Sequence, residues 1–136
     1  MFKIFDVSGS ALSAQLVRLN ATASNLANAE SVSTTQEGVY KAKHPVFKAT
    51  YDSFMDGSSS GVQVAGIVTS QAEGRREYAP NNPLADGEGY IFSSNVNSIE
   101  EMTNMLSASR SYQNNVEVLN TVKQLISRTL TLGQGR

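Results

Sequence analysis

The sequence contains no cysteine and no tryptophan, and it has one histidine among 136 residues. Without cysteine the chain has no disulfide framework, no thiolate nucleophile and no zinc site of the cysteine type. Charge is scarce as well: 17% of the residues are charged, against about a quarter in ordinary soluble domains, and the formal net charge is −1. A chain this close to neutral gives no electrostatic reason to expect binding to nucleic acid or to an acidic membrane.

Long apolar runs are also missing. Asp6 interrupts the apolar residues near the N-terminus, and no stretch approaches the roughly 18 apolar residues of a membrane-spanning helix. We therefore expect neither a cleaved secretory signal nor a membrane span, so that any export uses a route that reads no cleaved signal. The length suits one domain, or one domain with extended ends.

What the sequence does have is a heptad pattern near each end. Between Asp6 and about Asn28, apolar side chains recur at spacings of three, four or seven, which predicts an amphipathic helix suited to pairing. The other faces of this helix are mostly uncharged. The stripe consists of Phe5, Leu12, Leu16, Leu19, Ala23 and Leu26.

A second heptad pattern spans residues 98–132. Ser98 followed by Glu101 fits a capping box, and Gly133 is placed to end the helix in a left-handed conformation. We expect the two helices to pair as a coiled coil. The second stripe consists of Met102, Met105, Ser109, Tyr112, Val116, Leu119, Ile126 and Leu130.

Residues 30–97 have a different character, with short alternating or apolar runs bounded by glycine. These runs, at 39–43, 61–65 and 89–92, predict strands, while 56–61 and 80–83 read as turns. The expected core of this section is Tyr40, Val46, Phe47, Val62, Val64, Ile67, Tyr78, Leu84, Tyr90 and Phe92. The predicted fold class is therefore mainly α with a small, loop-rich β excursion. Residues 1–29 and 98–136 would form one inner-core domain, and residues 30–97 the excursion.

The outer faces of the helices are rich in small uncharged side chains. Within residues 98–132, fifteen are Ser, Thr, Asn or Gln, against three acidic and three basic. Such side chains cost little to desolvate, so they suit packing between subunits, and a contact repeated without closure builds a helical tube. Periodicity alone fits equally well an ordinary helical hairpin within a monomer. The low charge favours assembly.

The sequence offers no candidate catalytic, cofactor or metal site, and we expect no enzyme and no small-molecule substrate. His44 has no nucleophile motif beside it and reads as a surface residue. Arg75 and Arg76 are typical of a solvated or interface strand end. Asn25 and Asn28 have two readings: solvation of the end of the first helix, or a hydrogen-bond clasp where that helix leaves the pair.

Several longer motifs, in the same order along the chain, resemble the family of flagellar rod and hook proteins. The N-terminal ones are 4–12, 18–20 and 24–31. Those at 82–86, 89–90, 107–113, 115–123 and 129–134 are similar to its proximal-rod branch, the FlgC type.

This resemblance implies a structural subunit of the proximal rod, the periplasmic drive shaft of the flagellum. It further implies export by the flagellar type III apparatus, with transient contact to the export gate, and assembly into a helical tube. The implied partners are other proximal and distal rod proteins and the junction of the rod base with the MS ring. On the residues alone, a soluble coiled-coil adaptor or export chaperone remains the alternative.

The expected coiled-coil or assembly interface draws on both helices. Phe2, Ile4 and Phe5 either anchor the start of the first helix or form a hydrophobic export signal. The interface residues are Phe5, Leu12, Leu16, Leu19, Asn25, Leu26, Asn28, Met102, Met105, Tyr112, Val116, Leu119, Ile126 and Leu130.

Overall fold

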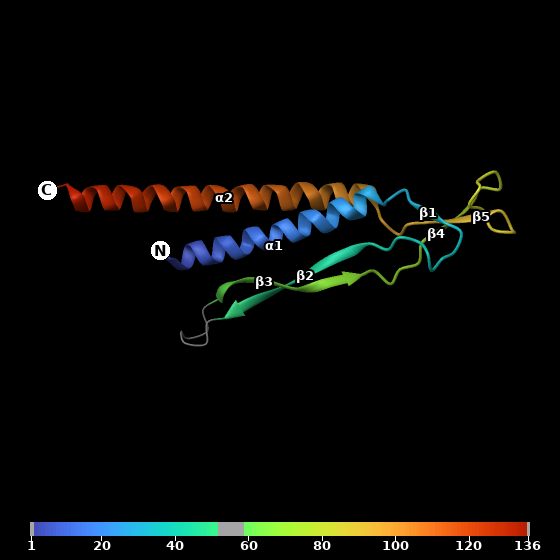
Figure 1. Cartoon of the computed structure of the whole chain (residues 1–136), viewed down its shortest axis with the longest axis horizontal. Coiled ribbons are helices and arrows are strands. Elements are labelled where there is room, and N and C mark those ends of the chain that lie inside the picture. The colour runs from blue at the N-terminus through green and yellow to red at the C-terminus, as the bar shows by residue number, and fades with distance from the viewer. Residues whose placement is uncertain (1, 52–58, 136) are drawn as a thin grey trace.

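The computed structural model describes residues 2–51 and 59–135. Two long helices lie side by side in opposite directions: α1 (Phe2–Ala27) and α2 (Ser98–Gln134). The described residues between them form five strands in two small sheets. Both termini lie toward one end of the elongated molecule, and the three-stranded sheet lies at the other (Figure 1). The predicted arrangement of two terminal helices around a small β section is thus confirmed.

The helices differ in length, and the difference leaves part of α2 alone. α1 has 26 residues and α2 has 37, which correspond to about 39 and 55 Å at 1.5 Å per residue. The C-terminal end of α2 extends beyond the start of α1 (Figure 1), and residues 127–133 are all exposed. No described helix has a stretch long and apolar enough to cross a membrane.

The ends of α2 differ from the predicted caps. Asn97 is the N-cap, and its side chain accepts hydrogen bonds from the amides of Ile99 and Glu100. The Ser98 and Glu101 capping box is therefore wrong, because Asn97 caps one residue earlier and the Glu101 side chain is buried inside the protein. The left-handed cap at Gly133 is wrong as well, since the helix continues through Gln134 to a C-cap at Gly135 with a φ of −81°.

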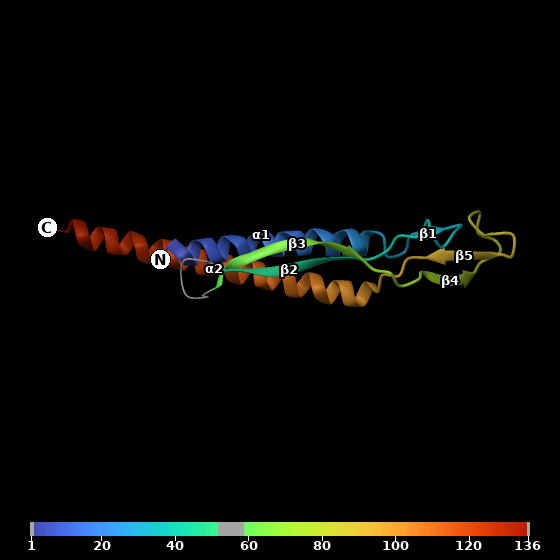
Figure 2. The same ribbon diagram turned by 90° about the horizontal axis from the view of Figure 1, so that it is seen from below.

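A two-stranded hairpin lies along α1. β2 (Lys43–Tyr51) pairs antiparallel with β3 (Ser59–Thr69), and both contact α1, which lies between this hairpin and α2 in Figure 1. In the view from below, the hairpin runs lengthwise over the line between α1 and α2 (Figure 2). The Ser10 hydroxyl joins the hairpin to α1, because it accepts from the amide of Val62 at 3.0 Å and donates to the carbonyl of Val7 at 2.8 Å.

The strand predictions for the hairpin succeed in part. The predicted strand at 61–65 lies within β3, whereas the run at 39–43 is wrong except at its last residue, where β2 begins. Tyr40 and Ala42 in that run instead pack and hydrogen-bond at the end of α1. The predicted turn at 56–61 lies outside the described residues up to 58, and its remainder belongs to β3.

The second sheet has the order β1 (Val32–Ser33), β5 (Tyr90–Ser93), β4 (Arg75–Tyr78), all antiparallel. The predicted strand at 89–92 corresponds to β5, and 80–83 form a turn as expected. Ile91 and Ser93 point inward and are buried, while Tyr90 and Phe92 are only half-buried.

The predicted core of the β section is largely wrong. Five of its ten members are half-buried, and the other five are exposed: Val46, Phe47, Ile67, Tyr78 and Leu84. The strands bury few of their side chains, since all four residues of β4 and seven of the nine of β2 are exposed, and the buried positions fall to other residues. These are Ala29, Val39, Ala42, Ile91 and Val96, three of which cluster where α1 ends and α2 begins.

Close packing beside β5 yields the first prediction. A Cβ at Gly74 would lie 2.4 Å from the backbone oxygen of Ser93, which cannot move without disturbing β5. Gly74→Ala should therefore lower the free energy of unfolding by about 1–3 kcal/mol, as overpacking does elsewhere. Urea unfolding of the purified chain measures this.

Gly66 in β3 supplies the matched control, because a Cβ there meets no atom within 4 Å. Gly66→Ala should change the free energy of unfolding by less than about 0.5 kcal/mol. Equal stability of the two variants would contradict the packing described around β5.

Candidate assembly surface

The buried face between the helices is built from small and polar side chains. On α2 the buried residues Glu101, Ala108 and Val122 are separated by seven and fourteen positions. Small side chains let helix backbones approach closely, but they bury little apolar area. On α1 the buried residues are Ser8, Ala14, Ala21, Thr22 and Asn25.

The predicted interface residues mostly flank this buried face. Asn25 alone among them is fully buried, whereas Leu16, Met102 and Leu130 are exposed in the single chain, so their part in an assembly interface stays a prediction. On α2 the seam passes one position earlier than predicted, since Glu101 and not Met102 faces α1. Half-buried are Phe5, Leu12, Leu19, Leu26, Asn28, Met105, Tyr112, Val116, Leu119 and Ile126.

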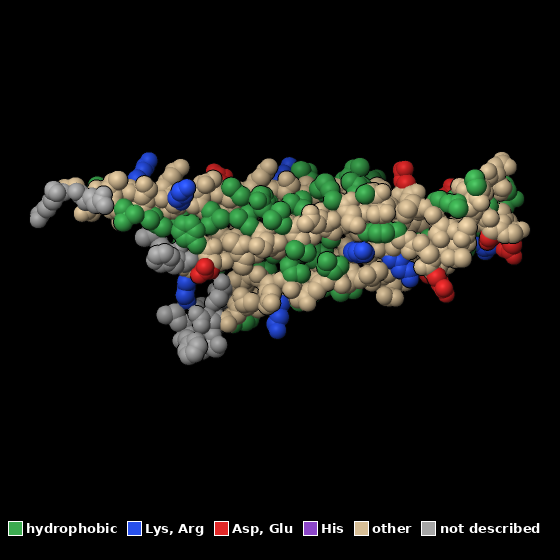
Figure 3. Space-filling view, viewed as in Figure 1, with side chains coloured by type: hydrophobic (Ala, Val, Ile, Leu, Met, Phe, Trp, Pro, Cys, Tyr) green, Lys and Arg blue, Asp and Glu red, His purple; other side chains and the backbone are tan. Residues whose placement is uncertain are grey.

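Large apolar side chains therefore remain at the surface of both helices. Leu132 is 82% exposed, Ile99 77% and Leu130 62%, and all three belong to α2. The space-filling view shows hydrophobic side chains gathered in a band along the helix pair (Figure 3). Continuous apolar surface of this kind marks interaction sites rather than the skin of a free monomer. Other exposed members are Ile4, Val7, Leu16, Met102, Leu106, Val118 and Leu125.

The start of the first helix also carries the residues proposed for export. Ile4 is exposed and Phe5 is half-buried in the first turns of α1. The side chain of Phe2 lies outside the described part of the structure. The described pair thus leaves apolar surface accessible at the N-terminal end.

A polar clasp formed by Asn25 joins four segments where the helices meet. Its side-chain NH2 donates to the carbonyl of Lys43 at 2.9 Å and to the carboxylate of Glu101 at 3.1 Å. Its side-chain oxygen accepts from the amide of Lys43 at 2.8 Å and from the hydroxyl of Tyr40 at 3.0 Å. That hydroxyl also lies 3.0 Å from the hydroxyl of Ser24. Asn25 is 0% exposed, and both atoms of its amide are fully used.

Asn28 makes only local hydrogen bonds at the end of α1, unlike Asn25. Its side chain donates back to the carbonyl of Ser24 at 2.8 Å, and its own carbonyl accepts from Ser31. These bonds satisfy the end of α1, which is the plainer of the two readings for this residue.

Two further polar residues fasten the same junction, and the sequence pattern gave no sign of them. The hydroxyl of Ser94, fully buried, donates to the carbonyl of Ala29 at 2.6 Å. Asn95 accepts from the amide of Ala42 and donates to the carbonyl of Ala72, both at 2.8 Å. Both residues lie in the short connection between β5 and α2. The sequence there predicts only a loop, because the partners of Ser94 and Asn95 are distant along the chain.

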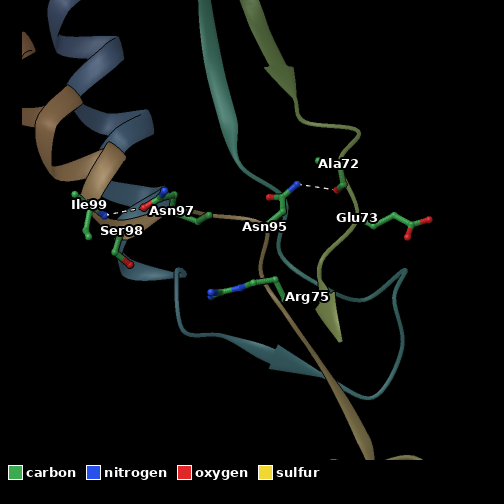
Figure 4. A pocket seen from close by; sticks show the side chains of 8 residues that line it. Ala72, Glu73, Arg75, Asn95, Asn97, Ser98 and Ile99 are labelled. Carbon is green, nitrogen blue, oxygen red and sulfur yellow. Dashed lines mark hydrogen bonds between the residues drawn. The ribbon is translucent and has the colours of Figure 1, made fainter. Parts of the chain in front are cut away.

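Beside this junction lies an open cavity of about 480 Å³, at the start of α2. The side chain of Arg75 extends from β4 toward α2 (Figure 4). The side chain of Asn95 donates to the carbonyl of Ala72, and that of Asn97 accepts from the amide of Ile99. No group of three His, Asp or Glu within the described residues could hold a metal ion. His44 is exposed on β2.

The far end of the molecule is held by a separate cluster. Arg76 forms an ion pair with Glu88 at 2.7 Å and stacks 3.8 Å from the ring centre of Tyr90. The amide of Tyr90 donates to Asp86 and, as the largest cause, lowers the pKa of that carboxyl. The ionised Asp86 carboxylate therefore stabilises the loop at a pH above the ordinary pKa of an aspartate. This stabilisation is lost as the pH falls through the lowered pKa of Asp86.

Comparison with known proteins decides which family this helix pair belongs to. The family model "Flagella basal body rod protein" matches residues 5–32, and "Flagellar basal body rod FlgEFG protein C-terminal" matches residues 88–132. The flagellar basal-body rod protein FlgC of Salmonella typhimurium is 52% identical over 134 residues, covering 98% of each chain. That of Escherichia coli O6:H1 is also 52% identical over 134 residues with 98% coverage of each, and that of Buchnera aphidicola from Acyrthosiphon pisum is 42% identical over 136, again with 98% of each.

The chain belongs to the FlgC family of flagellar basal-body rod proteins. As a member of the FlgC family it is a structural subunit of the basal-body rod, and neither matching model describes an enzyme family. The two models cover α1 with β1 and then β5 with α2. Both sides of the clasp between Asn25 and Glu101 thus lie within the FlgC-family matches.

Removing the clasp should destabilise this FlgC-family chain. Asn25→Ala takes away four hydrogen bonds and leaves the buried carboxylate of Glu101 without its amide partner. Because an unpaired buried polar group is costly, we expect the free energy of unfolding to fall by about 3 kcal/mol. Thermal unfolding monitored by circular dichroism provides the measurement.

Asn28→Ala is the matched control, three residues further along. Its side chain makes one hydrogen bond to its own helix, so the loss should stay below about 1 kcal/mol. If the two substitutions proved equally mild, Asn25 would not hold the junction together.

Proposed function

We propose that the chain builds the proximal rod by packing its helix pair against neighbouring rod subunits, which cover the apolar band left open on α1 and α2. The observation that carries this proposal is the exposure of large apolar side chains along both helices. Leu16 on α1 and Leu106 on α2 are 45% and 54% exposed, well away from the chain ends. A monomer has no reason to keep such surface, whereas a subunit completes its core with its neighbours.

In the assembled rod the pair forms an inner coiled-coil layer, with the β section outside it. The recurrence of buried residues at multiples of seven on α2 supports a heptad seam. The buried small residues support close approach of the two helices. Antiparallel pairing within one chain leaves the protruding end of α2 for contacts with the next subunit.

The contacts between subunits are heterologous, so that repetition builds a tube rather than a closed dimer. Low charge supports this arrangement, since side chains such as Ser, Thr and Asn can be buried against a neighbour at little cost. The partners are proximal and distal rod proteins and the junction of the rod base with the MS ring.

The chain reaches the rod unfolded, through the flagellar type III apparatus, and contacts the export gate in passing. A chain without cysteine folds after export without disulfide rearrangement. A helix pair with a thin buried face gains much of its stability from neighbours, so folding is coupled to assembly. Apolar residues at the start of α1 form part of the export signal.

An exposed leucine separates assembly from folding. Leu16→Asp should abolish rods and swimming, because a subunit contact would bury an unpaired carboxylate. The isolated chain should unfold within about 1 kcal/mol of the unchanged chain, since the side chain is 45% exposed there. Electron microscopy of basal bodies and a swimming assay give the readouts.

Ser13→Asp is the matched control, because it places the same charge at an exposed polar position one turn earlier. It should leave rods and swimming intact. Normal rods in the Leu16→Asp strain would sink the packing proposal.

The N-terminal signal can be tested by secretion alone. Replacing Phe2, Ile4 and Phe5 together with Ser removes the apolar character of the first turns, and we expect secretion through the flagellar apparatus to fall several-fold. Immunoblotting of exported and retained protein measures it. Unchanged secretion, with assembly impaired, would assign these residues to anchoring the helix instead.

A further inference from the structure

A second pocket, of about 350 Å³, lies where α1, β2 and α2 meet, one turn from the Asn25 clasp. Among the described residues, three basic ones line it and no acidic one does. The lining includes Arg18 and Thr22 from α1, Lys43, His44 and Phe47 from β2, and Asn104 from α2.

Arg18 has an incomplete environment in the isolated chain. Arg18 is half-buried, yet the one side-chain hydrogen bond of its guanidinium within the described residues goes to the neutral side-chain oxygen of Asn104, at 3.3 Å. A guanidinium has five N–H donors in a planar fork that matches a carboxylate. No described carboxylate lies within ion-pair distance of it.

The nearest acidic residue along α2 is already engaged. Glu101 lies one turn before Asn104, but its carboxylate accepts from the amide of Asn25 and is buried there. Lys43 contributes its backbone to the same clasp, while its ammonium group lies 5.7 Å from the ring centre of Tyr40. Neither the ammonium nor the guanidinium thus has a carboxylate partner among the described residues.

We propose that this pocket receives an Asp or Glu side chain of a neighbouring rod subunit. The inference rests on the proposed packing between subunits and names one contact within it. Charge complementarity carries it: Arg18 and Lys43 line an open pocket whose described lining contains no acidic residue, and a carboxylate would bind the guanidinium through two parallel hydrogen bonds. Since the apolar ring of Phe47 walls one side, the incoming residue is fixed in position as well as in charge.

Because the pocket is formed by three separate elements, it exists only when the helix pair and the hairpin are folded together. A neighbour's carboxylate in this place would therefore bind a correctly folded subunit in preference to an unfolded one. The contact sets the register between subunits, whereas the apolar band on α1 and α2 provides most of the surface area that they bury against each other.

A zero-length cross-link tests the contact directly. Carbodiimide joins a lysine amine to a carboxylate that touches it, so we expect purified basal bodies to yield a peptide linking Lys43 to an Asp or Glu of another subunit. Mass spectrometry identifies both residues. Lys43→Arg keeps the positive charge but removes the amine, and that cross-link should vanish while the rods persist.

Arg18→Gln supplies the functional arm. It should reduce the number of basal bodies at least about tenfold, because the incoming carboxylate would be left without its main partner. The isolated chain should unfold as before, since the bond to Asn104 is neutral and long. Arg110→Gln, at an exposed position on α2, is the matched control and should change neither.

Three results would overturn the proposal. The first is a wild-type number of basal bodies with Arg18→Gln, and the second is the absence of an intersubunit cross-link at Lys43. The third is a saturable shift of the His44 nuclear magnetic resonance signals when inorganic phosphate is added to the monomer, which would mark a site for small anions. Failure of the packing proposal is seen separately, in normal rods with Leu16→Asp. The cross-link at Lys43 is scored on the unchanged chain and does not depend on that variant.

Discussion

The buried amide of Asn25 is the interaction on which the rest of the structure depends. Its four hydrogen bonds hold the end of α1, the loop at Tyr40, the start of β2 and the first turn of α2 in one place. The pair is therefore closed firmly at one end by polar contacts that neighbours do not supply. Toward the termini the contact relies on small side chains, and residues 127–133 of α2 are exposed in the described part of the structure.

This asymmetry suits a family whose members build a rod. A closed end with saturated hydrogen bonds fixes the angle at which the β section leaves the helices. The open end keeps its leucines exposed, and this is the surface that we propose other subunits cover. The hairpin β2–β3 stiffens the middle, because Ser10 of α1 bonds its backbone directly.

Periodicity in the sequence predicted both helices and two of the strands, since those signals are local. Periodicity placed the buried face of α2 at Met102, one residue after its observed position at Glu101, because Met102 is the more apolar of the two. The hydrogen bond from Asn25 to Glu101 joins two distant segments, so no local pattern predicts it. For the same reason the predicted core of the β section was largely wrong: aromatic residues were expected there, and smaller residues are buried. Contacts such as Asn95 with Ala42 and Ala72 join segments distant in sequence, so no window along the chain contains them.

Amide hydrogen exchange along both helices, in the dilute monomer and in purified basal bodies, tests the central claim that the pair is closed by the clasp and completed by neighbours. In the monomer, amides near the clasp, in 18–27 and 101–108, should exchange slowly, and those in 2–12 and 120–134 rapidly. In basal bodies all four segments should be protected. Strong protection along the whole of both helices in the monomer would contradict the account.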